Sequence, residues 1–321
     1  MVSTSPSAVE TMRPGELVNI RFSGVVAFKA FCENIATVLK EGVFEVVKTD
    51  KFEGIMVEAM DKSRVCMVQG RLTGVVTYGK VGEYQFCVNM INIITSLRNA
   101  HPQHSLELYI LEDSTDVVLR VFEPQVQSYG PVFKLKTLDT RTEKICLDTL
   151  HYSMFIEVDL GTFRNAIKTA RDHKADTVLL RVLRPPPGES AAPSDPDGQR
   201  HTVFFVIHYR SDEVECTFPF RSSTETLEGK PGAPQTIRTI EDDSACDVCD
   251  GGMQHNFDAY EVLYSARFST EYLIVFTKNM ERHSLTLRVS KKIPLILDYP
   301  LGGGETNWIR FVLAPRVDDE E

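Results

Sequence analysis

Apolar residues recur with the period of an α-helix in two long stretches, residues 25–40 and residues 160–173. In the first stretch the apolar positions run from Phe28 to Leu39 with the i, i+3, i+4, i+7 spacing of one helical face. In the second stretch Phe163 and Ala170 bound the same kind of face. Two shorter helices are predicted at residues 90–97 and 270–279.

Most of the remaining chain is rich in β-branched and aromatic residues, and many segments alternate apolar with polar positions, which is typical of strands. The clearest predicted strands are Gly54–Glu58, Arg64–Leu72, Leu106–Leu111, Val117–Phe122, Thr177–Val182, Thr202–His208, Val214–Phe220, Ser284–Val289 and Ile309–Leu313. Strands thus account for most of the predicted structure, and only four stretches are predicted as helices.

The chain also repeats itself. His104-Ser-Leu-Glu-Leu108 is echoed by His283-Ser-Leu-Thr-Leu287, and each follows a basic residue joined to an asparagine, at Arg98 and at Lys278. Because a long predicted helix also opens each half, we expect two domains of similar fold.

The length of 321 residues suits two such domains. We assign 1–16 as a flexible N-terminal extension, 17–133 as the first domain, 134–151 as an interdomain connector and 152–321 as the second domain, with insertions near 184–200 and 224–256. The extension and the insertions are rich in Ser, Pro, Gly or acidic residues, and the connector is mostly polar.

The outer face of the helix at residues 160–173 carries only cations. Arg164, Lys168 and Arg171 follow the spacing i, i+4, i+7, and no carboxylate occurs before Asp172. The alternative is an ordinary solvated face, because most surface helices carry charge there. In a chain of net charge −10, a stripe of cations favours a surface that faces a polyanion.

Overall composition argues against other classes of protein. The net charge of −10 does not favour nucleic-acid binding by the surface as a whole, because Lys and Arg bind phosphate. Apolar runs such as Tyr272–Phe276 are too short to span a bilayer, and residues 1–16 do not resemble a secretory signal. We expect no membrane partner. An odd number of cysteines, seven, indicates a reducing compartment.

Catalytic and cofactor-binding patterns are missing from the sequence. Gly302-Gly-Gly304 lacks the Lys and Ser or Thr of a phosphate-binding loop, and the acidic residues are not grouped for two metals. Cys246 and Cys249, with His255 nearby, supply too few ligands for a structural zinc site. We interpret them as free thiols of a mobile loop, with a zinc or redox site as the alternative. The expectation is no enzymatic activity, no cofactor and no metal.

The C-terminal residues 311–321 favour an adaptor function. An apolar strand runs into Leu313-Ala-Pro315, where Pro315 cannot donate to a sheet. One cation, Arg316, and four carboxylates follow. A strand that ends in an exposed acidic tail is typical of a binding surface for other proteins.

From about Leu17 onward, the sequence resembles the family of eukaryotic DNA sliding clamps, the proliferating cell nuclear antigens. The motifs that carry the resemblance are Gly54-Ile-Met-Val-Glu-Ala-Met-Asp61, Val65-Cys-Met-Val-Gln69, Phe276-Thr-Lys278, Ile293-Pro-Leu-Ile-Leu-Asp-Tyr299 and Leu313-Ala-Pro315.

The resemblance implies an α+β fold with two similar clamp domains per chain and a closed homotrimeric ring, with sheets outside and helices lining the hole. Such a ring encircles double-stranded DNA without sequence specificity. It would act in the nucleus as a processivity factor for DNA polymerase, as a platform for replication and repair proteins, and as a substrate of a clamp loader. By family position, the DNA-binding cations would be Lys29, Lys40, Arg98, Arg164, Lys168, Arg171 and Lys278. Subunits would join through edge strands near Ser128–Lys134 and Glu215–Phe220.

The resemblance also implies a groove that accepts the hydrophobic plug of a short partner peptide. By family position, its residues would be Met60, Val65, Ile145, Leu147, Tyr152, Pro294, Val312, Leu313, Ala314 and Pro315. From residue type alone, plain core is the favoured interpretation of Met60, Val65 and Leu313, because such residues are usually buried; the family match favours the groove instead.

Several positions depart from the family pattern. Arg64 stands where the family commonly has His, and Val312 replaces a usual aromatic residue, so partner preference is expected to differ. Glu271 replaces a usual Arg, and Ala30 and Ala36 replace common lysines, which implies weaker DNA contact. Two alternatives remain: a subunit of a heterotrimeric checkpoint clamp, and a clamp-like scaffold that does not encircle DNA.

Overall fold

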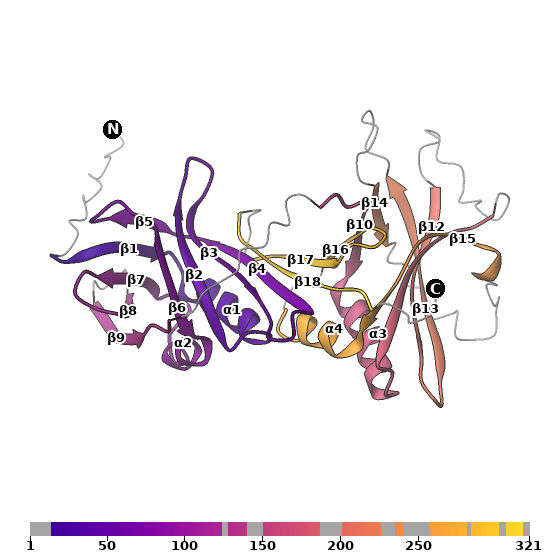
Figure 1. Cartoon of the computed structure of the whole chain (residues 1–321), viewed down its shortest axis with the longest axis horizontal. Helices are drawn as coiled ribbons and strands as arrows, with labels where there is room; N and C mark the ends of the chain where they lie inside the picture. Colours follow the sequence, from indigo (N-terminus) through magenta and orange to yellow (C-terminus); the bar gives the residue numbers. More distant parts are fainter. Residues whose placement is uncertain are drawn as a thin grey trace. The chain divides into compact units, whose positions relative to one another are not determined.

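The computed structural model describes residues 14–123, 128–139, 150–186, 201–225, 235–239, 257–280, 284–301 and 306–316 (Figure 1). Several sequence predictions lie outside these ranges. They are residues 1–13 of the extension, Ile145 and Leu147, most of both insertions with Cys246, Cys249 and His255, and the acidic tail.

The chain forms two compact units that exchange short segments. The first unit comprises Met1–Ala59, Gly70–Glu143 and Pro300–Trp308, and the second comprises Met60–Gln69, Lys144–Tyr299 and Ile309–Glu321. The predicted domains at 17–133 and 152–321 follow chain order, whereas the units assign Met60–Gln69 to the same body as the C-terminal segment. This places Met60, Val65 and the Leu313–Pro315 segment within one unit.

The first unit consists of strands with two short helices. Its elements are β1 Glu16–Phe22, α1 Val25–Ala36, β2 Glu41–Lys48, β3 Glu53–Met60, β4 Cys66–Thr73, β5 Val75–Tyr78, β6 Tyr84–Asn89, α2 Met90–Ser96, β7 Ser105–Leu111, β8 Asp116–Glu123 and β9 Ser128–Lys136. Of these strands, β3 ends and β4 begins with residues of the segment Met60–Gln69, which belongs to the second unit. One sheet has the order β5-β1-β7-β8-β9, and the other strands follow β4-β3-β2-β6. Helices α1 and α2 are in contact with each other.

The second unit also consists of strands with two helices. Its elements are β10 Met154–Asp159, α3 Leu160–Asp172, β11 Thr177–Arg184, β12 His201–Arg210, β13 Glu215–Glu225, β14 Gln235–Thr239, η2 Phe257–Ala259, β15 Glu261–Ser269, α4 Thr270–Thr277, β16 Ser284–Val289, β17 Leu295–Pro300 and β18 Trp308–Leu313. Its strands follow the order β15-β11-β12-β13-β14-β10-β16-β17-β18, and α3 contacts α4.

The predicted repeat corresponds to equivalent strand pairs. In the first unit β1 pairs antiparallel with β7, and Leu108 of the repeated motif lies opposite Ile20. In the second unit β10 pairs antiparallel with β16, and Leu287 lies opposite Ile156. All four side chains are essentially inaccessible to solvent. The repeated leucines therefore serve the same purpose in each core, and the prediction of two similar α+β domains is confirmed.

Three local predictions need correction. Helix α1 ends at Ala36, so Lys40 lies between this helix and β2 rather than on the helix. The amides of residues 37–39 turn back onto the carbonyls of Asn34 and Ile35, which closes the helix early. Strand β9 runs to Lys136, into the segment expected to be connector, because Leu135 is buried opposite Val117.

The third correction concerns the insertion near 224–256. It contains strand β14, which pairs antiparallel with β13 and parallel with β10. The side chain of Ile237 in this strand is fully buried. The β-branched residues Thr236, Ile237 and Thr239 give the segment its strand character, and burial of Ile237 fixes which face points inward. Part of the insertion is thus sheet, not loop.

Edge strands occupy the positions expected for subunit contacts. β9 is the last strand of the five-stranded sheet. In the described chain, residues 215–221 of β13 pair with β12, and β14 pairs with β13 only from Ser222 onward. Unpaired strand edges of this kind can accept a strand from another chain.

Candidate functional site

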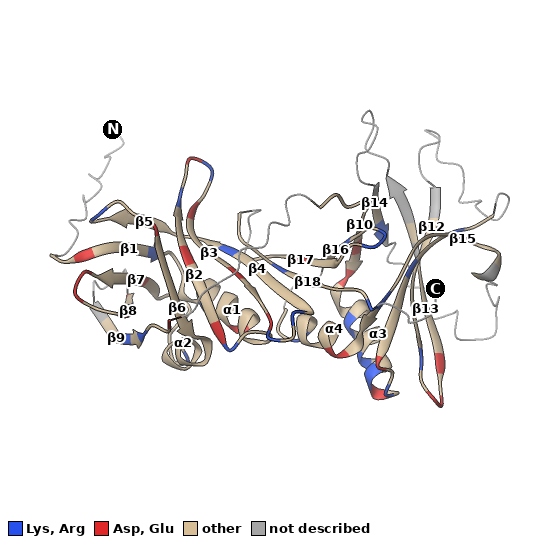
Figure 2. Cartoon of the chain, in the orientation of Figure 1, with Lys and Arg blue, Asp and Glu red and all other residues tan. Residues whose placement is uncertain are grey.

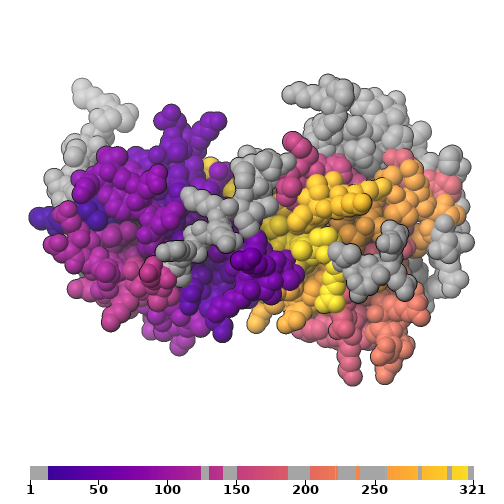
Figure 3. All heavy atoms as spheres, in the orientation of Figure 1, coloured from indigo at the N-terminus to yellow at the C-terminus, as the bar shows by residue number. Residues whose placement is uncertain are grey.

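The C-terminal segment is held against the turn between β3 and β4 in the second unit. The amide of Ala314 donates a hydrogen bond of 3.0 Å to the carbonyl of Val65. Two residues further on, the amide of Arg316 donates to the carbonyl of Arg267 at 2.8 Å. These bonds continue the path of β18 past Pro315, and Figure 3 shows the C-terminal segment, in yellow, at the surface of the face in view.

Asp61 organises the turn that carries Val65. Its carboxylate accepts hydrogen bonds of 2.9 Å from the amides of both Val65 and Cys66. It also accepts bonds from the hydroxyl of Ser63 and from the hydroxyl of Tyr272 on α4. Arg64 takes the left-handed conformation, with φ of 59°. The hydrogen bonds of Asp61 therefore hold the turn on its inner side, and the flanking side chains of Met60 and Val65 are exposed.

These hydrogen bonds also set the charge state of Asp61. Partial burial acts to raise the pKa of the carboxyl group, but the bonds from Ser63, Tyr272 and the two backbone amides outweigh burial and lower it. Asp61 is consequently ionised at neutral pH, the form that can accept all of these bonds.

Met60 and Val65 flank this turn and are exposed for apolar residues, each at 37%. Nearby in the same unit, Met67, Ile296 and Val312 form a small buried cluster, against which Tyr152 packs. An exposed apolar pair beside an apolar floor is the arrangement expected of a peptide-binding surface.

Tyr152 is fixed at this floor. Its hydroxyl donates a hydrogen bond of 3.0 Å to the carbonyl of Pro294. Burial raises the pKa of Tyr152 to about 12, against the opposing effect of Arg288 and Arg310. The ring thus stays neutral and in place at any physiological pH.

The predicted groove residues fall into three groups. Met60 and Val65 are accessible, and Tyr152, Pro294, Ala314 and Pro315 are partly buried. Leu313 is fully buried and Val312 nearly so, which makes Leu313 a core residue beneath the surface rather than a wall of it. Ile145 and Leu147 lie outside the described residues.

Residue-type reasoning missed four contributors to this surface. Met67 and Ile296 form part of its floor, and Asp61 and Tyr272 hold its turn. Asp61 could have been found, because Asp followed by Lys and Ser is a common turn signal in which the carboxylate bonds later amides. The Tyr272 contact joins residues 211 positions apart, so no local signal marks it.

The cations of α3 do not all face solvent. Lys168 and Arg171 are exposed, whereas Arg164 is partly buried and donates a hydrogen bond to the carbonyl of Met280 after α4. Arg171 also pairs with its neighbour Asp172 at 2.9 Å, an exposed contact of little energetic weight. The predicted stripe is therefore formed by Lys168 and Arg171, with Arg164 linking the two helices.

The helices of the first unit are less basic than α3. Lys29 on α1 faces Glu33 at 3.9 Å, and Arg98 lies just after α2. Val26 on α1 and Ile91 on α2 are exposed at 50% and 61%. Figure 2 shows the contrast: α1 and α2 are largely tan, whereas blue residues recur along α3. Lys278 is exposed at the end of α4.

No group of three or more His, Cys, Asp or Glu residues suited to a metal occurs within the described ranges. Cys32, Cys66 and Cys87 are buried, and burial raises the pKa of Cys32 and of Cys66. Raised thiol pKa values make Cys32 and Cys66 poor nucleophiles. Among the described helices, none combines the length and apolarity that crossing a membrane requires.

The fold is that of a PCNA-like sliding clamp, which confirms the predicted fold class. In sequence, the chain is 23% identical to the proliferating cell nuclear antigen of Chaetomium thermophilum over 296 residues, which span 89% of this chain and 97% of that protein. No family model matches the chain.

Two solved structures share the fold. The chain is similar to the proliferating cellular nuclear antigen of Entamoeba histolytica, with a TM-score of 0.65 and 15% identity over 94% of this chain and 100% of that one. It is also similar to PCNA from Thermococcus kodakaraensis, with a TM-score of 0.63 and 18% identity over 93% and 100% of the two chains. PCNA-like clamps are non-enzymatic scaffolds, and the expectation that this chain is not an enzyme follows from that likeness.

Proposed function

We propose that the chain forms a homotrimeric ring around double-stranded DNA and acts as a processivity factor for DNA polymerase. The observation that carries this proposal is the likeness to proliferating cell nuclear antigen over nearly the whole length of both chains. The ring would form between edge strands, with β9 of one subunit beside residues 215–221 of β13 in the next. We further propose the nucleus as its site of action.

DNA would be held by phosphate contacts from the exposed cations Lys168, Arg171 and Lys278, with smaller contributions from Lys29, Lys40 and Arg98. Such contacts position a protein without reading sequence and weaken with salt. Topological closure, achieved with a clamp loader, would then keep the ring on DNA. Arg164 is assigned mainly to packing, because its guanidinium already bonds Met280.

Partner proteins of replication and repair would dock through a short peptide with a hydrophobic plug. The plug would contact Met60 and Val65, with Tyr152 and Pro315 at the sides. The exposure of Met60 and Val65 beside the Met67–Val312 cluster supports this role. We expect the flank of the peptide to run along the C-terminal segment.

The assembly can be tested by light scattering on the purified chain. A homotrimer should give about three times the chain mass of 36.2 kDa. A stable monomer would contradict the homotrimer and would favour a subunit of a mixed clamp instead.

Encirclement requires a separate test. The protein and a clamp loader are incubated with nicked circular DNA, and half of the sample is then linearised with a restriction enzyme. We expect retention on the circle and loss from the free ends. Equal retention on both forms would favour a scaffold that binds DNA without surrounding it.

A further inference from the structure

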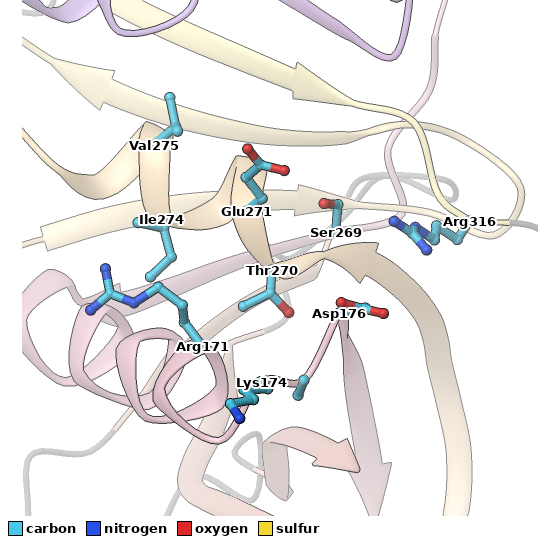
Figure 4. A pocket seen from close by; sticks show the side chains of 10 residues that line it. Arg171, Lys174, Asp176, Ser269, Thr270, Glu271, Ile274, Val275 and Arg316 are labelled. Carbon is cyan, nitrogen blue, oxygen red and sulfur yellow. The ribbon is translucent and has the colours of Figure 1, made fainter. Parts of the chain in front are cut away.

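A cavity of about 290 Å³ lies in the second unit, between the C-terminal end of α3 and the N-terminal end of α4 (Figure 4). The residues that line it are Arg171, Lys174, Ala175, Asp176, Ser269, Thr270, Glu271, Ile274, Val275 and Arg316. Arg171 is the last cation of the α3 stripe, so the cavity begins where that stripe ends.

The N-terminus of α4 opens into this cavity without a side-chain cap. Ser269 occupies the N-cap position, but its hydroxyl makes no capping hydrogen bond. The amide of Thr270 donates to the carbonyl of Asp176 at 3.0 Å. The next amides of the first turn have no partner within an α-helix and carry the positive end of its dipole. An anion is the natural ligand for such a helix end.

The hydroxyl of Thr270 supplies an independent indication of a ligand. Thr270 is 3% exposed, and its Oγ1 has no hydrogen-bond partner among the described residues. In Figure 4 this oxygen points into the space between Lys174 and Asp176. A buried hydroxyl that lacks a partner is unfavourable, and an acceptor oxygen entering the cavity would satisfy it.

Charge limits the ligand to a single anionic group. Three cations line the cavity, Arg171, Lys174 and Arg316, against two carboxylates, Asp176 and Glu271. The small excess of positive charge suits one phosphate rather than a cluster of them. The partly buried side chains of Ile274 and Val275 add an apolar flank, which suits the sugar attached to a backbone phosphate.

We propose that this cavity binds one phosphate group of the DNA backbone. Thr270 Oγ1 and the first-turn amides of α4 donate hydrogen bonds to it, and Arg171, Lys174 and Arg316 balance its charge. The proposal rests on the DNA-binding function proposed above and makes it more specific. It assigns one phosphate to a cavity, whereas Lys168 and Lys278 are exposed cations that would contact DNA at the surface.

Thr270→Val tests the site directly, because it removes the hydroxyl and keeps the shape. With a fluorescent duplex oligonucleotide at low salt, we expect affinity to fall about tenfold to a hundredfold, the range for one hydrogen bond to a charged group. Thr270→Ser retains the hydroxyl and should bind like the wild type. Lys291→Ala removes an exposed cation outside the cavity and serves as the charge control. Melting temperatures verify that each variant is folded.

A measurement with inorganic phosphate tests ligand binding in the cavity separately from the binding of DNA by the whole chain. In sodium phosphate, compared with sodium chloride of equal ionic strength, the melting temperature of the wild type should rise, and that of Thr270→Val should not. Stabilisation by phosphate with unchanged duplex affinity in Thr270→Val would overturn the assignment to DNA and leave a site for free phosphate. No effect of the variant in either measurement would overturn the site itself. If the wild type bound no duplex at all, the proposed function would fail, and the phosphate titration would still report on the cavity.

Discussion

The hydroxyl of Tyr272 donates a hydrogen bond of 2.7 Å to the carboxylate of Asp61, and so joins helix α4 to the turn between β3 and β4. The same carboxylate accepts the amides of Val65 and Cys66. One side chain thus connects the proposed DNA-facing helix with the proposed partner-binding surface, and both belong to the second unit. Loss of this carboxylate should loosen the turn that presents Val65.

The lowered pKa of Asp61 makes the stability of the fold depend on pH in a defined direction. Its pKa in the folded protein lies below 3.8, the ordinary value expected in the unfolded chain. Its contribution to stability is therefore present above about pH 4 and is lost as the pH falls through the folded value. Asp61→Asn should lower the free energy of unfolding by about 1 kcal/mol at pH 7, and the difference from wild type should shrink in acid.

Guanidinium unfolding at a series of pH values measures this difference. Asp50→Asn, at an exposed position, is the matched control and should track the wild type. A difference between Asp61→Asn and wild type that grew as the pH fell would contradict the assigned direction of the pKa shift.

Met60 and Leu313 should respond differently to the same substitution. Met60→Asp places a charge on an accessible surface, and we expect loss of binding to a hydrophobic-plug peptide with an unchanged melting temperature. Leu313→Asp places a charge in the core, where Leu313 is fully buried, and should destabilise the fold by more than about 4 kcal/mol.

Val81→Asp is the control for both, because Val81 is 89% exposed and lies in the first unit. It should alter neither peptide affinity, measured by fluorescence anisotropy, nor stability. Normal peptide binding by Met60→Asp would remove this surface from the proposal.

The cations of α3 should dominate DNA binding. Replacement of both Lys168 and Arg171 by Ala should reduce the slope of log affinity against log salt by about 1.8, if each contacts one phosphate. The corresponding change for Lys29 and Arg98 should be smaller, because Lys29 is offset by Glu33. Anisotropy titrations over a range of salt concentrations provide the slopes. Equal slopes for the two double variants would contradict the assigned dominance of α3.

Strand β14, which lies in the insertion near 224–256, should contribute to the stability of the fold. Ile237 is fully buried where β14 meets β13 and β10. Ile237→Ala should therefore lower the free energy of unfolding by about 2–5 kcal/mol. Val81→Ala, at an exposed position, should change it by less than about 0.5 kcal/mol. A neutral effect of Ile237→Ala in chemical denaturation would mean that β14 is dispensable for the fold.

Local pattern predicted much of the fold. The apolar face of α3 was predicted from Phe163 to Ala170, and those end residues are fully buried. The repeated leucines at 108 and 287 marked equivalent strands in two units. These features depend on periodicity along one segment, which the order of residues contains directly.

Other features depend on which segments meet, and the sequence order does not contain that information. Residue type could not tell Met60, which is accessible, from Leu313, which is buried, because both are apolar residues at strand ends. In the sequence Arg164 belongs to a regular stripe of cations. In the structure its guanidinium donates a hydrogen bond to the carbonyl of Met280, which lies 116 positions away. Likewise, the place of strand β14 in the sheet depends on its pairing with β10, which the order of residues does not show.

The sequence by itself therefore determined the α+β class, the duplication and the region of the candidate surfaces. The tertiary structure alone decided which side chains in those regions are accessible, since burial and hydrogen bonding arise between distant segments. It also brought together the unpaired hydroxyl of Thr270, the uncapped end of α4 and the cations Arg171, Lys174 and Arg316, which come from three separate parts of the chain.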